Sequence, residues 1–172
     1  MRCFFTPATR KGAPLGKVPP GEAEQTSLIA GIEIFTRPSA LTAIQASPEY
    51  KEYFSPVGQG EALFTRDVTA WYPTAGFVAR KDKDQPETGP AKVVMLARFV
   101  CKDGEGMREK LVAVLGTFCD WVESHEPTTL TYSVMIQPTK NNAPNEVLLF
   151  ERYKDLAALS THSKTAEFRA ML

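Results

Sequence analysis

Apolar and polar residues in the carboxy-terminal half of the chain follow a pattern that predicts a strand, a helix and two further strands. Residues 92–101 form an apolar, valine-rich run that is typical of a strand buried on at least one face. Apolar residues then recur every three or four positions over 107–122, as on one face of a helix that ends before Pro127. Residues 130–137 alternate so as to give a strand with one apolar and one mixed face, and residues 146–153 form the next strand.

A second helical pattern follows these strands, and it is predicted to contain a break. Asp155 suits the amino-terminal cap of a helix that starts at Leu156. On a straight helix, Phe168 would point away from the apolar face of Leu156 and Ala166. A break near residues 163–166 would bring Phe168 back to the core.

The amino-terminal half has fewer regular elements. Short strands are predicted near residues 3–7 and 27–35, followed by a helix from Pro38 and a last strand within residues 64–79. Residues 81–91 combine charge, proline and glycine without an apolar anchor, which predicts a linker.

Two segments of the chain repeat each other at a constant offset of 118 residues, namely 31–54 and 149–172. The matching pairs include Glu33 with Glu151, Ala40-Leu41 with Ala158-Leu159, Glu49 with Glu167 and Tyr50 with Phe168. Because the first copy has Pro48 where the second has Ala166, the helix break is predicted in both copies.

The repeat predicts an α+β protein made of two related halves, 1–80 and 92–172, joined by the linker. The second half has the order of a ferredoxin-like unit that lacks its last strand. The first half supplies an incomplete version, without the opening strand and helix.

Composition excludes several classes of partner. Twenty basic and twenty acidic side chains cancel, so no charge favours nucleic acid or an anionic membrane. No apolar run reaches the roughly 20 residues that span a bilayer, and no secretory signal is visible, so we expect a cytoplasmic protein. Two histidines and three dispersed cysteines do not form a metal-ligand cluster.

The chain resembles the antibiotic biosynthesis monooxygenase (ABM) family. The residues that carry the resemblance are Val93–Val100, Glu126-Pro127, Leu130-Thr131-Tyr132 and, most specifically, the run from Glu151 to Phe168; Ala75–Arg80 resembles the end of the family's last strand. The resemblance implies a dimeric α/β barrel of ferredoxin-like sheets with external helices. Two halves in one polypeptide would form a pseudo-dimer, and the chain is also a candidate homodimer.

Members of this family include monooxygenases that oxidise phenolic compounds to quinones without metal or flavin. The resemblance therefore implies an enzyme that needs no cofactor and that oxidises an electron-rich aromatic molecule (a phenol, anthrone or quinol) with O2, as in secondary metabolism. Haem degradation is disfavoured, because Val93–Val100 lacks the asparagine that haem-degrading relatives use. A ligand-binding or scaffolding barrel without turnover, and an isomerase or dehydratase, stay open as alternatives.

Four residues are candidates for the site. His162 is the candidate catalytic acid/base, because its ordinary pKa of about 6.5 allows proton exchange near neutrality; the alternative is a partly exposed histidine bonded to a backbone carbonyl. Arg98 either pairs with Glu151 or binds an anionic oxygen of the substrate. Tyr132, on the apolar face of its strand, and Tyr153, within the matching run, are further candidates for binding the substrate.

Overall fold

The computed structural model describes residues 2–5, 30–52, 68–80, 90–137 and 145–171. The chain divides into two compact units, Met1–Asp67 and Val68–Leu172. The predicted linker at 81–91 lies almost entirely outside the described residues. So do residues 64–67, the first part of the range in which the last strand of the amino-terminal half was predicted.

The first unit contains a two-stranded sheet and a helical segment. Strand β1 (Arg2–Phe5) pairs antiparallel with β2 (Ala30–Glu33), and helix α1 spans Pro38–Ala46. The helix is interrupted at Ser47, and a second helical segment covers residues 48–52.

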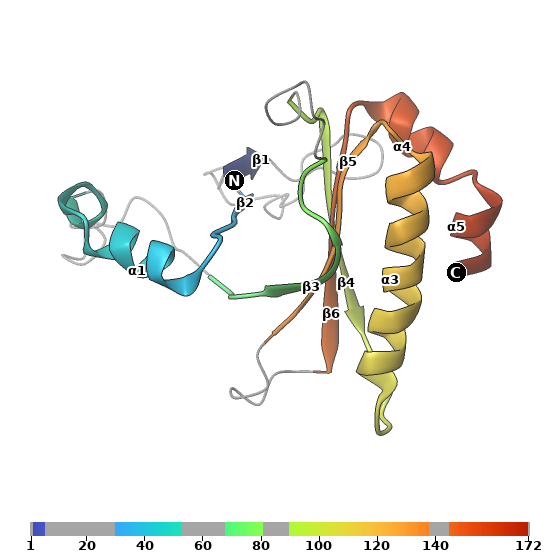
Figure 1. The fold of residues 1–172 in the computed structure, drawn as a ribbon, viewed down its shortest axis with the longest axis horizontal. Coiled ribbons are helices and arrows are strands. Elements are labelled where there is room, and N and C mark those ends of the chain that lie inside the picture. The colour runs from blue at the N-terminus through green and yellow to red at the C-terminus, as the bar shows by residue number, and fades with distance from the viewer. Residues whose placement is uncertain (1, 6–29, 53–67, 81–89, 138–144, 172) are drawn as a thin grey trace, which may run out of the picture. The chain divides into compact units, whose positions relative to one another are not determined.

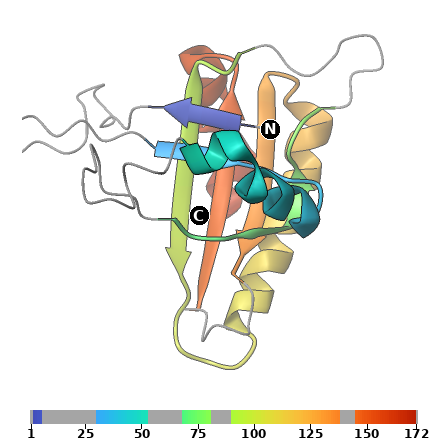
Figure 2. The same cartoon turned by 90° about the vertical axis from the view of Figure 1, so that its left-hand side faces the viewer.

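The second unit is built on a four-stranded antiparallel sheet. Its strands are β3 (Tyr72–Phe77), β4 (Val93–Val100), β5 (Thr129–Ile136) and β6 (Glu146–Tyr153), in the order β3-β5-β6-β4. In Figure 2, β4, β6 and β5 lie side by side in yellow-green, red-orange and orange. The first strand of the predicted ferredoxin-like unit thus lies beside its third strand, and the α+β prediction is confirmed.

Three helices cover one face of this sheet: α3 (Met107–His125), α4 (Leu156–His162) and α5 (Ala166–Met171) (Figure 1). Helix α3 turns one stripe inward at a spacing of three and four residues, as its sequence predicted. That stripe consists of Leu115, Phe118, Cys119 and Val122. It packs against the helix-facing side chains of the sheet, which include Phe77, Tyr132, Val134, Val147, Leu149 and Tyr153.

Among the described strands, β3 forms one edge of this sheet, beside β5. The sequence had placed this strand at the end of the amino-terminal half, whereas in the structure it packs with the second unit. An edge position suits Pro73, which cannot donate a hydrogen bond to a neighbouring strand. A register shift follows between Pro73 and Ala75, and Gly76 adopts a φ of 76°. The tandem-repeat interpretation, with halves at 1–80 and 92–172, stays a prediction.

The predicted helix breaks are confirmed in both copies. Helix α4 ends at His162 and α5 begins at Ala166, so Phe168 turns back and packs against the core. The Oγ1 atom of Thr165 accepts a hydrogen bond of 3.2 Å from the backbone N–H of Phe168. In the first unit, Ser47 Oγ accepts the equivalent bond of 3.2 Å from the N–H of Tyr50. The two cap residues lie 118 positions apart, the same offset as in the sequence repeat.

Cys101 and Cys119 are free thiols. Cys119 is fully buried, whereas Cys101 is half-buried. Burial raises the pKa of the Cys119 thiol to about 12, so this side chain stays protonated and packs as a small apolar group.

Within the described part of the chain, none of the helices combines the length and apolar character needed to cross a bilayer.

Candidate functional site

His162 lies at the end of α4, and its ring is 1% exposed. The Asp155 carboxylate fixes the start of this short helix, because its Oδ1 accepts a 2.9 Å hydrogen bond from the N–H of Ala158. The end of the helix is closed where Thr165 donates its hydroxyl to the carbonyl of His162, at 2.9 Å. Side-chain hydrogen bonds therefore fix both ends of α4, and with them the position of His162.

The imidazole of His162 is paired with the carboxylate of Glu126. Its Nδ1 atom lies 2.8 Å from Oε2 and 2.9 Å from Oε1 of Glu126. Glu126 follows the last residue of α3, and its N–H still donates to the carbonyl of Val122 at 2.9 Å. The hydroxyl of Thr129 donates to Oε2 of Glu126 at 2.8 Å. A carboxylate held in this way keeps a proton on Nδ1 and leaves Nε2 as the acceptor.

The second ring nitrogen of His162 faces Tyr132. The hydroxyl oxygen of Tyr132 lies 3.4 Å from Nε2, which is a long hydrogen bond. Burial strongly raises the pKa of Tyr132, so the phenol keeps its proton. With the proton of the imidazole on Nδ1, the hydroxyl is the donor of this contact and Nε2 the acceptor.

Four aromatic rings enclose the imidazole. Their centroids lie 4.8 to 5.7 Å from that of His162 and belong to Phe118, Tyr132, Tyr153 and Phe168. Such an enclosure excludes water and strengthens every polar contact inside it. The pair is thus a polar site within an otherwise apolar layer between sheet and helices.

A buried pair of a carboxyl and a hydroxyl group, Glu151 and Tyr153, lies beside the Glu126–His162 pair. Tyr153 donates its hydroxyl to Oε2 of Glu151 at 2.5 Å, and both residues are buried. Burial raises the pKa of Glu151, while the bond from Tyr153 acts in the opposite direction. Burial also strongly raises the pKa of Tyr153, which stays a donor. Glu151 lies directly opposite Tyr132 in the β5–β6 register, so the two pairs are neighbours.

The structure thus brings three of the four predicted site residues together: His162, Tyr132 and Tyr153. The alternative for His162, partial exposure with a bond to a backbone carbonyl, is wrong. Sequence reasoning did not assign Glu126 to the site. The available signal was its place in the Glu126-Pro127 pair, where the proline ends α3 and restricts the backbone of the residue before it, Glu126.

Arg98 lies apart from this cluster. Its guanidinium binds the Glu146 carboxylate with two bonds, from Nε to Oε2 at 2.9 Å and from Nη2 to Oε1 at 2.5 Å. An ion pair was expected, but the expected partner, Glu151, is wrong. Arg98 is paired with Leu148 in the β4–β6 register, whereas Glu151 is paired with Met95. Side chains alternate between faces, so Arg98 and Glu151 lie on opposite sides of the sheet.

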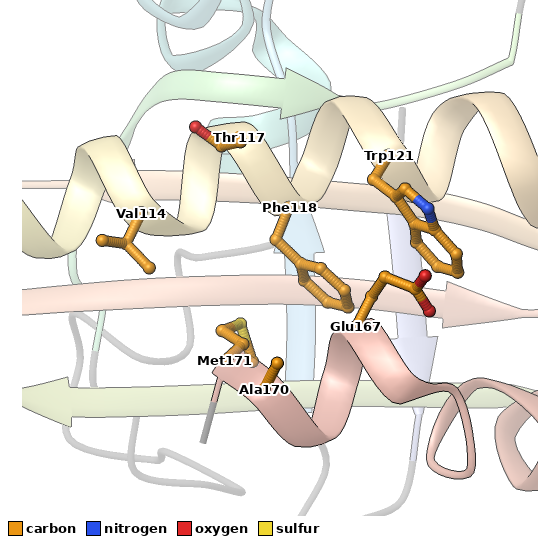
Figure 3. A pocket seen from close by; sticks show the side chains of 7 residues that line it. All are labelled: Val114, Thr117, Phe118, Trp121, Glu167, Ala170 and Met171. Atoms are coloured by element: carbon orange, nitrogen blue, oxygen red, sulfur yellow. The ribbon is translucent and has the colours of Figure 1, made fainter.

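An apolar groove runs between α3 and α5, with a volume of about 450 Å³ (Figure 3). Its walls are Val114, Thr117, Phe118 and Trp121 from α3, and Glu167, Ala170 and Met171 from α5. This volume is in the range of small-molecule sites. Phe118 belongs both to the groove and to the rings around His162, so the groove and the buried site share this side chain.

No group of three or more potential metal ligands occurs among the residues that the structure describes.

Comparison with known proteins bears on this architecture. Residues 93–172 match the sequence model of the antibiotic biosynthesis monooxygenase family. This part of the chain is an ABM domain. It holds all of the buried site described above, and it is completed at one sheet edge by β3, which precedes it.

A solved structure resembles a larger part of the chain. It is described as the "crystal structure of putative monooxygenase from Lactobacillus acidophilus NCFM", with a TM-score of 0.52 and 16% sequence identity. The similarity covers 83% of this chain and 60% of the other, so this chain spans less than two thirds of that protein. At this identity the likeness concerns the fold, which extends beyond the ABM domain. No curated protein matches the sequence.

Proposed function

We propose that this protein is a monooxygenase that oxidises an electron-rich aromatic molecule, of the phenol, anthrone or quinol type, with O2 and without a cofactor. The observation that carries the proposal is the buried Glu126–His162 pair within the ABM domain. An acid/base group in a dry, apolar layer is what formation of a phenolate requires. His162 is the proposed catalytic residue.

The proposed reaction begins when Nε2 of His162 takes the proton of the substrate hydroxyl, while Glu126 balances the charge on the ring. The hydroxyl of Tyr132, 3.4 Å from Nε2, then turns to donate to the phenolate oxygen. The phenolate gives one electron to O2, and the substrate radical and superoxide combine in a new C–O bond. His162 returns its proton to the peroxide, and loss of water leaves the quinone. One oxygen atom enters the product and the other leaves as water.

The groove between α3 and α5 is the proposed entrance for the substrate. Its aromatic floor, Phe118 and Trp121, suits a planar aromatic ring. Phe118 and Phe168 separate it from His162, so the proposal requires their side chains to move. Helix α5 is six residues long and has no fully buried residue, which makes it the element of this layer that opens at least cost.

Tyr153 is proposed to line the inner end of the site through its ring, because its hydroxyl is engaged by Glu151. Arg98 takes no part in this scheme, since it lies on the other face of the sheet and its guanidinium is bound by Glu146.

Oxygen uptake tests the proposal. The full chain is mixed with an anthrone or a naphthol in buffer with a metal chelator, and O2 consumption is compared with that of His162→Ala and His125→Ala. His125 is the matched control, since it is exposed and its Nδ1 contacts the carbonyl of Trp121. We expect uptake by the wild type, unchanged uptake in His125→Ala and a loss of about 100-fold or more in His162→Ala. A loss below about threefold in folded His162→Ala removes the histidine from the mechanism.

A second candidate, a ligand-binding barrel without turnover, is favoured by one observation. His162 is 1% exposed and enclosed by four rings, as a histidine that only stabilises a core would be. Saturable binding of the aromatic compound without O2 uptake supports this candidate. Conversion of the compound without O2 uptake supports the isomerase or dehydratase alternative.

The same proposal includes the assembly of the protein. A tandem origin of the halves 1–80 and 92–172, closed as a pseudo-dimeric barrel, is supported by the equivalent caps at Ser47 and Thr165. A homodimer is supported by β4, which forms an edge of the sheet in the described part of the chain. Light scattering of the full chain separates the monomeric from the dimeric form.

A further inference from the structure

The turn that carries Glu126 is built around a residue from outside the ABM match. Arg80 follows β3 and precedes residue 93, where the match begins. Its guanidinium donates from Nε to the carbonyl of Thr129 at 2.7 Å and from Nη2 to the carbonyl of Glu126 at 2.6 Å. Glu126 follows the last residue of α3 and Thr129 is the first residue of β5, so the two carbonyls lie on either side of the Pro127-Thr128 turn. One planar group therefore holds both ends of the turn.

The same side chain also closes α3. Its Nη1 donates to the carbonyl of Glu123 at 2.8 Å, and its Nη2 reaches that of Val122 at 3.2 Å. These carbonyls lie in the last turn of α3, where a positive charge is favourable. The carbonyl of Glu123 has no helix donor of its own, because residue 127 is proline. The guanidinium lies 4.9 Å from the ring centroid of Phe77, which supports it from β3.

A chain of contacts links Arg80 to the imidazole of His162. Arg80 fixes the carbonyl of Thr129, whose hydroxyl donates to Oε2 of Glu126 at 2.8 Å. The same carboxylate binds Nδ1 of His162. Arg80 thus sets where the Glu126 carboxylate lies, and the carboxylate sets which ring nitrogen is the acceptor.

We infer that Arg80 is a positioning residue for His162, acting through the Glu126 turn. A single ammonium group could not replace it, because four carbonyls accept from its fork of N–H groups. The catalytic part of this inference rests on the proposed function, whereas the protonation pattern of His162 is measured without turnover.

Nitrogen-15 NMR of the full chain labelled at histidine and arginine tests the inference. The chain has two histidines, so exposed His125 serves as an internal reference for His162. In the wild type, at a pH where the His162 ring is neutral, we expect the proton on Nδ1. In Arg80→Lys we expect a mixture of the two tautomers and a loss of oxygen uptake of about 10- to 100-fold. The matched control is Arg98→Lys, on the opposite face of the sheet, where we expect neither change.

The outcomes are distinguishable. A folded Arg80→Lys variant with the wild-type tautomer overturns the inference, whatever its activity. If Arg80→Lys has an altered tautomer but the wild type does not consume O2, the proposed function is wrong and the positioning role of Arg80 is supported. If Arg80→Lys does not fold, the wild type itself decides: titration of His162 should shift the Arg80 guanidinium resonance and leave that of Arg98 in place. If the chemical shift of the Arg80 guanidinium does not change during this titration, the inference is overturned.

Discussion

Replacing Gly76 with alanine tests the packing of β3 on the sheet. Gly76 has a φ of 76°, a conformation that costs an L-residue about 1 to 2 kcal/mol. A Cβ atom there would lie 2.1 Å from the carbonyl oxygen of Tyr132 and 2.9 Å from Sγ of Cys119. The first of these atoms is backbone and cannot turn away. The strand itself must move, and crowding of this kind adds about 1 to 3 kcal/mol.

The chain provides a matched control for the backbone part of this cost. Gly106, before α3, has a φ of 73°, and a Cβ atom there would meet nothing within 4 Å. Gly106→Ala therefore carries the strain of the left-handed conformation without the collision. We expect it to cost about 1 to 2 kcal/mol, and Gly76→Ala about 2 to 5 kcal/mol.

Urea unfolding of both variants, followed by circular dichroism, measures the difference. A loss at the upper end for Gly76→Ala is a large share of the 5 to 15 kcal/mol that typically stabilises a folded protein. Equal losses in the two variants, within about 0.5 kcal/mol, would show that β3 does not press against Tyr132 and Cys119.

Three further predictions concern the polar groups of the second unit. Burial raises the folded-state pKa of Glu151 above its ordinary value of 4.5. Wild-type stability should therefore fall as the pH rises from 4.5 to this raised pKa, because the folded state holds the proton more tightly than the unfolded state. Urea midpoints measured against pH should show this fall in the wild type but not in Glu151→Gln. Asp155→Ala removes the acceptor for the N–H of Ala158 and should cost about 1 kcal/mol in urea unfolding, and a loss below about 0.3 kcal/mol would contradict the cap. Arg98→Met should leave O2 uptake unchanged, because Arg98 lies on the face away from His162; a drop above threefold would return it to the site.

Local pattern was sufficient for most elements of the second unit. The apolar stripe of α3, the cap at Asp155 and the break between α4 and α5 depend on neighbours within a few residues, and all were predicted. The break also moves Phe168 against His162, with ring centroids 4.8 Å apart. Part of the site was therefore already encoded in a local backbone preference.

The partner of Arg98 could not be predicted from the local sequence pattern. Glu151 was the expected partner, but which glutamate lies on the face of Arg98 depends on the register of β4 against β6. A strand shifted by one residue would exchange the faces of all its side chains. Register is set by the packing of the whole sheet, which no single strand determines.

By itself, the sequence determined the α+β class, the ABM resemblance and the positions of the helix boundaries, because these follow from periodicity, capping and motif. Only the tertiary structure decided that Glu126, 36 residues before His162, is the partner of its imidazole. The same holds for Arg80 and Glu126, which lie 46 residues apart. The physical reason is that hydrogen bonds between distant segments depend on how sheet and helices pack, and burial then fixes which groups keep their protons.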